Sequence, residues 1–462
     1  MSNGEDDLME PSREAAPLES WLTRRRQECG LVYSRIPWAA SREWRLLNGR
    51  LVHASRRFFS IAGVRAIHPY QRIECQPIIH QPEIGILGFL LARDAGGLKI
   101  LIQAKSEPGN VGVVQLAPTV QATESNYLRV HGGEATPHLE HFLGGSSAVV
   151  ADSLQSEQGM RFFGKYNRNM TVVAEGLVEP ESRNLAWFDV GELLRLLDHD
   201  YCVNTDARSV LACSDWHLLA GERLPFSTGH GSNAFRERLA ISFRGVPDGD
   251  MQNMTAALRS LGHFRAAAAL NVEHIALDAL AAHGWQMEGH EIVDRDRSRL
   301  RVAQYEVWAP EREVKHWDQP LVQSLDVGHA VLLCQVQQGV LRFLFAPSLE
   351  VGFVEKVQFG PSLLRETAVM EKRSGRMRQL WQMATGATDD QKRLSCLQSD
   401  EGGRFFHSIT RYEIIEIPQD ERLETASLGV WLSLAEVYVL LRIKGIFTNE
   451  ARTLISMLLV YL

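Results

Sequence analysis

Short apolar runs separated by turn-forming residues recur along the chain. The runs Ile84–Leu91 and Leu98–Gln103 flank Asp94-Ala95-Gly96-Gly97, a stretch whose residue types favour a tight turn. This arrangement predicts a β-hairpin. The same reasoning predicts four more strands, at Ala330–Val336, Val340–Phe345, Thr171–Ala174 and Glu413–Ile417.

Helical spacing of apolar residues marks other segments. Asp189–Leu197 carries leucines three and four positions apart, and Asp189 is the expected N-cap. The alanine-rich segment Phe264–His283 predicts a long helix, and Leu454–Leu462 predicts a short helix facing the core. Because strands and helices are grouped instead of alternating, the pattern favours an α+β fold.

The chain repeats itself over a long distance. Gln76-Pro77 recurs 243 positions later as Gln319-Pro320, and the sequence LQSEQGMRFF at 154–163 recurs at the same offset as LQSDEGGRFF. With one more residue of drift, Ala207-Arg208 recurs as Ala451-Arg452. The period is far longer than a solenoid repeat, so it indicates a tandem duplication of a whole domain.

The duplication predicts a domain plan. We expect the first repeat to span residues 18–219 and the second to span residues 234–462. Between them, residues 220–233 are rich in Gly, Pro and Ser, which is typical of a linker. Residues 1–17 are acidic and polar, and we expect them to be disordered.

Charge and cysteine content exclude several classes of protein. The net charge is −7 and the basic residues are scattered, so no nucleic-acid-binding stripe is predicted. The six cysteines form no CxxC pair, which argues against a zinc or redox motif. No apolar run reaches the roughly 18 residues that a membrane span needs. Reduced thiols in the cytoplasm are therefore expected.

Three long segments resemble one enzyme family. They are GILGFLLARDAGGLKILIQAKSEPGNVGVVQLAPTVQATESNYLRVHGG at 85–133, RFFGKYNRNM at 161–170 and VNTDARSVLAC at 203–213. Together they resemble the NDP-hexose 2,3-dehydratases, and the resemblance extends over nearly the whole chain. It implies two fused Nudix-like α+β domains, a homodimer, and action on a dTDP-linked 4-keto-6-deoxyhexose that yields a 3,4-diketo-2,6-dideoxy sugar.

The implied reaction defines what the site must contain. The C4 ketone acidifies the C3 proton, and its removal allows the C2 hydroxyl to leave as water. The enol then becomes the 3-ketone, so there is no net redox change and we expect no cofactor and no metal. A base for C3, a cation or donor at the C4 oxygen and an acid for the hydroxyl are required.

Polar residues of the first repeat could supply these groups. Gln103, Lys105 and Glu107 alternate along one predicted strand, which places them on one face. We expect Glu107 to act as base or acid, and Lys105 to stabilise the enolate. Glu107 recurs as Glu350, so a structural role for it remains open. Tyr127 and His131 are further candidates for proton transfer.

Other polar residues of the first repeat are expected to bind the substrate. Arginines suit a diphosphate, although Arg161 and Arg168 recur as Arg404 and Arg411, so a structural role competes. The full set of expected binding residues is Gln103, Asn110, Gln121, Thr123, Asn126, Arg129, Gln155, Arg161, Arg168, Asn169 and Asn204.

The second repeat has lost polar residues that the first repeat keeps. By simple alignment Gln103 and Lys105 become Phe345 and Pro347, while glycines and apolar positions persist. We therefore expect the first repeat to carry the chemistry and the second to keep a scaffold or accessory role.

Two other functions fit parts of the sequence. A Nudix-type pyrophosphohydrolase needs a helix rich in carboxylates, and the nearest approach, RETAVMEKR at 365–373, has Val369 and Met370 where a Glu pair is required. A non-catalytic nucleotide-sugar binding protein is the second alternative. It would explain the drift of the second repeat but not the polar residues kept in the first.

Overall fold

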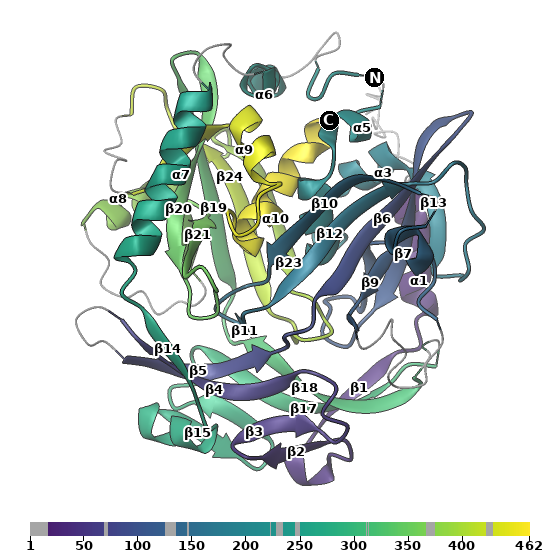
Figure 1. Cartoon of the computed structure of the whole chain (residues 1–462), viewed down its shortest axis with the longest axis vertical. Helices are drawn as coiled ribbons and strands as arrows, with labels where there is room; N and C mark the ends of the chain where they lie inside the picture. The colour runs from purple at the N-terminus through teal and green to yellow at the C-terminus, as the bar shows by residue number, and fades with distance from the viewer. Residues whose placement is uncertain are drawn as a thin grey trace, which may run out of the picture.

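The chain forms a mixed α+β structure made mostly of sheets, with two lobes stacked one above the other (Figure 1). No helix of the described part is long and apolar enough to cross a membrane. This computed structural model describes residues 17–68, 73–124, 135–145, 147–221, 223–227, 234–244, 250–310, 312, 314–365, 375–421 and 428–462. The expected tail up to residue 16, and residues 222 and 228–233 of the expected linker, therefore lie outside the described part.

The upper lobe contains one seven-stranded sheet from each repeat, and the two sheets have the same strand order. The first sheet consists of β6 (Gly85–Asp94), β7 (Gly97–Ser106), β8 (Val114–Ala117), β9 (Val120–Ala122), β10 (Ala148–Ser156), β12 (Tyr166–Val173) and β13 (Leu185–Asp189). The second consists of β19 (Gly328–Gln337), β20 (Val340–Leu349), β21 (Val357–Gly360), β22 (Leu363–Arg365), β23 (Lys392–Ser399), β24 (Ile409–Glu416) and β25 (Val430–Ser433).

The register of these sheets confirms the duplication. In the first sheet β12 runs parallel to β6 with Asn167 opposite Gly85, and in the second β24 runs parallel to β19 with Thr410 opposite Gly328. Both pairs are separated by the 243 positions seen in the sequence. The predicted hairpins are also confirmed, since β6 pairs with β7 and β19 with β20.

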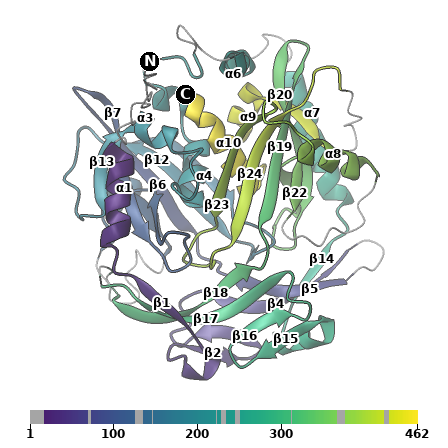
Figure 2. The same cartoon turned by 180° about the vertical axis from the view of Figure 1, so that it is seen from behind.

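The lower lobe mixes strands of the two repeats (Figure 2). One sheet contains β1 (Val32–Ile36), β15 (Trp285–Glu288), β16 (Glu291–Asp294), β17 (Leu300–Trp308) and β18 (His316–Ser324). The other contains β2 (Trp44–Leu47), β3 (Arg50–His53), β4 (Ser60–Ile67), β5 (Ile73–His80), β11 (Phe162–Phe163) and β14 (Asn271–Ile275). Thus β1 of the first repeat pairs with β17 of the second, and β14 of the second pairs with β4 of the first. The repeats exchange their first strands.

Helices border and separate the two upper sheets. They are α1 (Pro17–Glu28), α3 (Val190–Arg195), α4 (Thr205–Cys213), α5 (Trp216–Leu219), α6 (Ala234–Arg244), α7 (Asp250–Ala267), α8 (Gly375–Thr385), α9 (Leu434–Leu440) and α10 (Asn449–Met457), with short 3₁₀ turns at Trp38–Ala40, Leu139–Phe142, Asp278–His283 and Leu458–Tyr461. Asp189 lies at the N-cap position of α3, but its side chain accepts a hydrogen bond from Lys99 and caps nothing. The apolar end of the chain is helical and buried, as expected.

The prediction of one helix over Phe264–His283 is wrong. Helix α7 ends at Ala267, Asn271–Ile275 forms strand β14, and a 3₁₀ turn follows. The segment NVEHI contains β-branched residues, and β4 of the other repeat supplies its hydrogen-bonding partner. A pairing with a strand about 200 residues away outweighs the local helical pattern.

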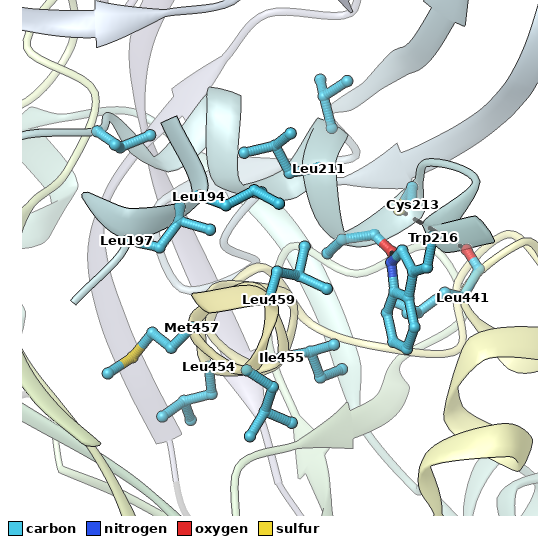
Figure 3. Close-up of a cluster of buried hydrophobic side chains, with 14 of the residues drawn as sticks. Leu194, Leu197, Leu211, Cys213, Trp216, Leu441, Leu454, Ile455, Met457 and Leu459 are labelled. Atoms are coloured by element: carbon cyan, nitrogen blue, oxygen red, sulfur yellow. Dashed lines mark hydrogen bonds between the residues drawn. The ribbon is translucent and has the colours of Figure 1, made fainter. Parts of the chain in front are cut away.

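The core of the upper lobe is shared between the repeats. Helices α4 and α10 lie against each other between the two sheets, and Figure 3 shows Leu211 of α4 and Leu454 and Ile455 of α10 in one buried cluster, with Leu459 between them. Arg452 is 1% exposed and donates hydrogen bonds to Ser209 Oγ at 2.8 Å and to the carbonyl oxygen of Phe447 at 2.7 Å. Since the core crosses from one repeat to the other, neither repeat buries its apolar face alone.

Two backbone contacts, which we call the clasps, join the repeats at their loops. In the first clasp, Gly109 N–H donates to Gly402 O at 3.0 Å and His407 N–H donates to Gly109 O at 2.9 Å. In the second, Gly352 N–H donates to Gly159 O at 2.8 Å and receives a bond at its carbonyl from Gly164 N–H. In the first clasp, the loop after β7 is bonded to the loop before β24 of the second repeat. In the second clasp, the loop after β20 is bonded to the loop before β12 of the first repeat.

The first clasp leaves no room for a side chain. A Cβ added to Gly109 would lie 1.7 Å from the carbonyl oxygen of Phe405. We expect Gly109→Ala to lower the free energy of unfolding by roughly 1–3 kcal/mol, as overpacking does. The control, Gly262→Ala in helix α7, meets no atom within 4 Å and should raise it by about 1 kcal/mol. Urea unfolding measures both, and equal effects would contradict this account.

Candidate active site

A group of ionisable residues, four of them buried and two partly buried, lies beside the first clasp. We call it the ionisable cluster, and it comprises Lys105, Glu107, Glu157, Lys165, Asp206 and Glu401. All but one of these residues belong to the first repeat. Glu401 comes from the second repeat, on the loop that the clasp holds in place. The site is therefore built from both repeats.

Strand β7 delivers the first two members. Lys105 lies near its end and Glu107 follows it, with Lys105 Nζ 3.4 Å from Glu107 Oε1. Lys105 Nζ also donates to the carbonyl oxygen of Gln121 at 3.3 Å. Glu107 is 2% exposed, and no donor among the described residues reaches its buried Oε2. A buried oxygen that accepts no hydrogen bond lowers the stability of the folded protein, unless a proton or a ligand supplies the missing partner.

Helix α4 delivers a second wall of the site. Asn204 is its N-cap, accepting a bond from Ala207 N–H at 2.8 Å while its amide donates to Gln121 Oε1 at 3.1 Å. Asp206 lies in the first turn of α4 and is buried. Asn204 thus holds the side chain of Gln121 in place, and the first turn of α4 adds the carboxyl group of Asp206 to the cluster.

Strand β12 delivers amides to the same site. Asn167 and Asn169 alternate along one of its faces, and Asn167 donates to Glu157 Oε1 at 2.8 Å. Asn449 of the second repeat donates to Glu157 Oε2 at 3.1 Å. Both oxygens of Glu157 are therefore held, whereas Asn169 Oδ1 is buried with no donor among the described residues.

Burial changes the acidity of three members. Burial, followed by repulsion from Glu157 and Glu401, raises the pKa of Asp206 well above its usual value. Burial and the neighbouring Glu107 raise the pKa of Glu401 to about 7. Burial lowers the pKa of Lys165 to about 8, against the attraction of Glu157. Protons can therefore be taken up and released here near neutral pH.

Several residues expected from the sequence meet at this cluster. Lys105, Glu107, Gln121 and Asn204 are in contact as described above. Gln103 precedes Lys105 by two positions on β7, so both side chains lie on one face. Other expected residues at the edge of the cluster are Asn110 beside the first clasp and Asn169 on β12, and Thr123 directly follows β9.

Other expected residues are engaged elsewhere. Arg168 forms a bidentate ion pair with Asp152, with Nε 2.9 Å from Oδ1, and both side chains are partly exposed to solvent. The buried amide of Gln155 donates to the carbonyl oxygen of Leu441 at 2.8 Å. Arg161 donates to Ser324 Oγ at 3.1 Å, beside a pocket of the second repeat. Asn126, Tyr127, Arg129 and His131 lie outside the described residues.

Sequence analysis missed Glu157, Lys165, Asp206 and Glu401. A signal was available for Asp206, because it follows an N-cap and its counterpart in the duplicated α10 is the acidic Glu450. No local signal was available for Glu401, since the other repeat brings it to the site.

A pocket occupies the place in the second repeat that is equivalent to the ionisable cluster. It is lined by Gln158, Arg161, Ser324, Gly328, Leu364, Arg365, Asp400, Ile409, Thr410, Tyr412 and Glu450. Leu364 stands where the first repeat has Gln121, and Tyr412 stands where it has Asn169. At these two positions the pocket of the second repeat has lost the amide side chains that the first repeat keeps.

The expected replacement of Gln103 and Lys105 by Phe345 and Pro347 is wrong by one position. Lys105 pairs with Gln115 in the first sheet, and Ser348 pairs with Gln358 in the second. The equivalents are therefore Ala346 and Ser348, so the amide of Gln103 and the charge of Lys105 are absent from the second repeat. Phe345 points into the core, where it is 0% exposed.

Comparison with known proteins agrees with this duplicated architecture. A family model described as NDP-hexose 2,3-dehydratase matches residues 15–214 and again residues 254–458. A match over both repeats places the chain among the lyase-type sugar-nucleotide dehydratases. The chain belongs to the NDP-hexose 2,3-dehydratase family, as its sequence predicted.

Three relatives are named dTDP-4-dehydro-6-deoxy-alpha-D-glucopyranose 2,3-dehydratase. The protein of Saccharopolyspora spinosa is 34% identical over 446 residues, covering 95% of this chain and 90% of the relative. That of Amycolatopsis orientalis is 32% identical over 455 residues, covering 95% and 89%. That of Streptomyces violaceoruber is 32% identical over 421 residues, covering 88% of each.

The ion pair of Arg168 generates a prediction. Because its guanidinium is already paired with Asp152 and faces solvent, Arg168→Ala should leave KM for the nucleotide sugar within about two-fold of wild type. Stability should fall by less than about 1 kcal/mol, as for other exposed pairs. Steady-state kinetics and urea unfolding measure the two effects. A rise of KM by about ten-fold would instead return Arg168 to the substrate site.

Proposed function

We propose that the protein removes water across C2 and C3 of a dTDP-linked 4-keto-6-deoxyhexose to give the 3,4-diketo-2,6-dideoxyhexose. The names and 32–34% identities of its relatives support this substrate. The observation that carries the proposal is the ionisable cluster, in which Lys105 Nζ lies 3.4 Å from Glu107 Oε1.

We assign the steps of the reaction to three residues. Ionised Glu107 removes the proton from C3, and the ammonium group of Lys105 stabilises the negative charge that develops on the C4 oxygen. Burial raises the pKa of Asp206 well above its usual value, which favours its protonated form, and we assign to it the delivery of a proton to the departing C2 hydroxyl. Glu107 then returns its proton to C2, and the enol proton restores Asp206.

The remaining expected residues retain proposed roles. Tyr127 and His131 are candidates for proton transfer, with Asn126 and Arg129 as binding residues on the same segment. Gln103, Asn110, Gln121, Thr123, Asn169 and Asn204 are proposed to bind the sugar or the nucleotide. Gln155, Arg161 and Arg168 have protein partners, which favours a structural role for them.

We also propose a Nudix-like fold for each repeat and a homodimeric assembly. The mixed sheets with the parallel β6–β12 pair, repeated as β19–β24, are compatible with such a fold. The dimer rests on the family resemblance.

Substitutions in the cluster test the assignment. Lys105→Met and Glu107→Gln should each lower kcat/KM for dehydration by about 10²–10⁴-fold, because each removes a group needed in the transition state. Ser348→Ala, at the position equivalent to Lys105, is the matched control and should change kcat/KM by less than about two-fold. Product formation from the 4-keto sugar is followed directly. If Ser348→Ala were as damaging as Lys105→Met, the active site would not be in the first repeat.

A chelator separates the two alternative functions from dehydration. We expect the protein to consume the 4-keto sugar at an unchanged rate in EDTA, because the assigned groups are side chains that need no metal ion. A magnesium-dependent pyrophosphohydrolase would stop in EDTA and would release a nucleoside monophosphate. Tight binding of the nucleotide sugar without any turnover would favour the non-catalytic binding protein.

A further inference from the structure

A carboxyl pair spans the junction between the repeats. Glu107 belongs to the loop after β7, and Glu401 belongs to the second repeat's loop before β24. We propose that these two carboxyl groups share one proton, and that Glu401 is a positioning residue that holds the proton so that Glu107 stays ionised as the base. The catalytic consequence rests on the proposed function, whereas the shared proton does not.

The geometry brings the two carboxyl groups together. A single point, the Cβ position built on Gly403, lies 2.4 Å from Glu401 Oε1 and 3.2 Å from Glu107 Oε1. The two carboxyl groups are therefore close neighbours in the cluster. Two neighbouring carboxylates repel each other and have no hydrogen to share, whereas one proton held between them removes that repulsion. Such a proton also gives Glu107 a hydrogen-bond donor, which its buried Oε2 lacks among the described residues.

The surroundings favour one negative charge on the pair. Cationic groups face it from two sides, with Lys105 on β7 and Arg404 on the loop of Glu401 itself. Asp206 on α4 faces Glu401 from a third side and adds another carboxyl group to this crowded site, where burial and the neighbouring carboxyl groups raise its pKa. Burial and Glu107 raise the pKa of Glu401 to about 7, so this carboxyl keeps its proton up to neutral pH. Glu157 and Lys165 complete the charged neighbours of the cluster.

The equivalent junction in the second repeat has no pair of carboxyl groups at these two positions. Gln158 is the counterpart of Glu401, and its amide donates to Asp400 Oδ1 at 3.0 Å. Glu350 is the counterpart of Glu107, and it accepts bonds from Met160 N–H at 3.1 Å and from Ser348 Oγ at 2.8 Å. Each of these three bonds has an ordinary donor. The carboxyl pair thus exists only at the junction that contains Lys105.

The shared proton is not consumed in the reaction. Glu107 takes the C3 proton and later gives it to C2, while Asp206 gives its proton to the hydroxyl that leaves as water and regains one from the enol. Glu401 stays protonated throughout and acts through Glu107. Once Glu401 ionises, the second charge repels the developing enolate, so the rate falls.

The pH profile of kcat tests the catalytic part. Wild type should lose activity above about pH 7, where Glu401 ionises. Gln donates a hydrogen bond but cannot ionise, so Glu401→Gln should retain activity within about three-fold at pH 6 and move the basic limb upward by at least about one pH unit. Gln158→Ala, at the equivalent place in the second repeat, is the control and should leave the basic limb unchanged. A Glu401→Gln profile that overlays that of wild type would overturn the positioning role.

Unfolding of the ligand-free protein tests the shared proton independently of activity. The folded-state pKa of Glu401 is raised, so its stabilising proton is fully bound below the unfolded pKa and is lost as the pH rises through about 7. Glu401→Gln should therefore gain stability relative to wild type between about pH 5 and pH 8. Glu107→Gln, which removes the other half of the pair, should reduce this pH dependence as well.

The two experiments separate the two proposals. If wild type does not turn over the 4-keto sugar, the proposed function fails, and the unfolding curves still decide whether the proton is shared. If wild type turns over but the stability difference between Glu401→Gln and wild type is the same at all pH values, the shared proton is refuted. Infrared spectra give a second ligand-free measurement, because both Glu→Gln variants should lose part of the band of protonated carboxyl groups.

Discussion

The backbone hydrogen bonds of the two clasps are the constraint on which the rest of the structure depends. They need glycine at positions 109 and 352, because a Cβ atom there would lie 1.7 Å from the carbonyl oxygen of Phe405 or 1.8 Å from that of Phe162. Through them a loop of each repeat is held by the other repeat. The position of Glu401 beside Glu107 is a direct result, since the first clasp fixes the backbone on both sides of that pair.

The frame is symmetric, but the chemistry it carries is not. Sheet order, register, clasps and central helices recur in both repeats. The side chains at equivalent places differ, with Lys105 against Ser348 and Glu401 against Gln158. Backbone geometry is preserved because packing tolerates few changes, whereas a lining residue can lose its charge at little cost to the fold.

Local patterns in the sequence predicted local features. The hairpins followed from apolar runs around turn residues, and the duplication followed from the fixed offset. Lys105 and Glu107 were found because alternation along a strand was visible. The same alternation should have separated Arg168 from Asn169, since neighbours on a strand face opposite ways. Strand β14 and Glu401 could not be predicted, because each depends on contact with the other repeat.

The exchange of β1 and β14 bears on how the protein arose. A polypeptide of half this length would present an unpaired edge on its β4-type strand and a first strand with no sheet to join. Two such molecules could satisfy each other only by swapping those strands, which is a domain-swapped dimer. Gene fusion would then have made that dimer a single chain, raising the effective concentration of one half near the other and freeing one of two identical sites to diverge.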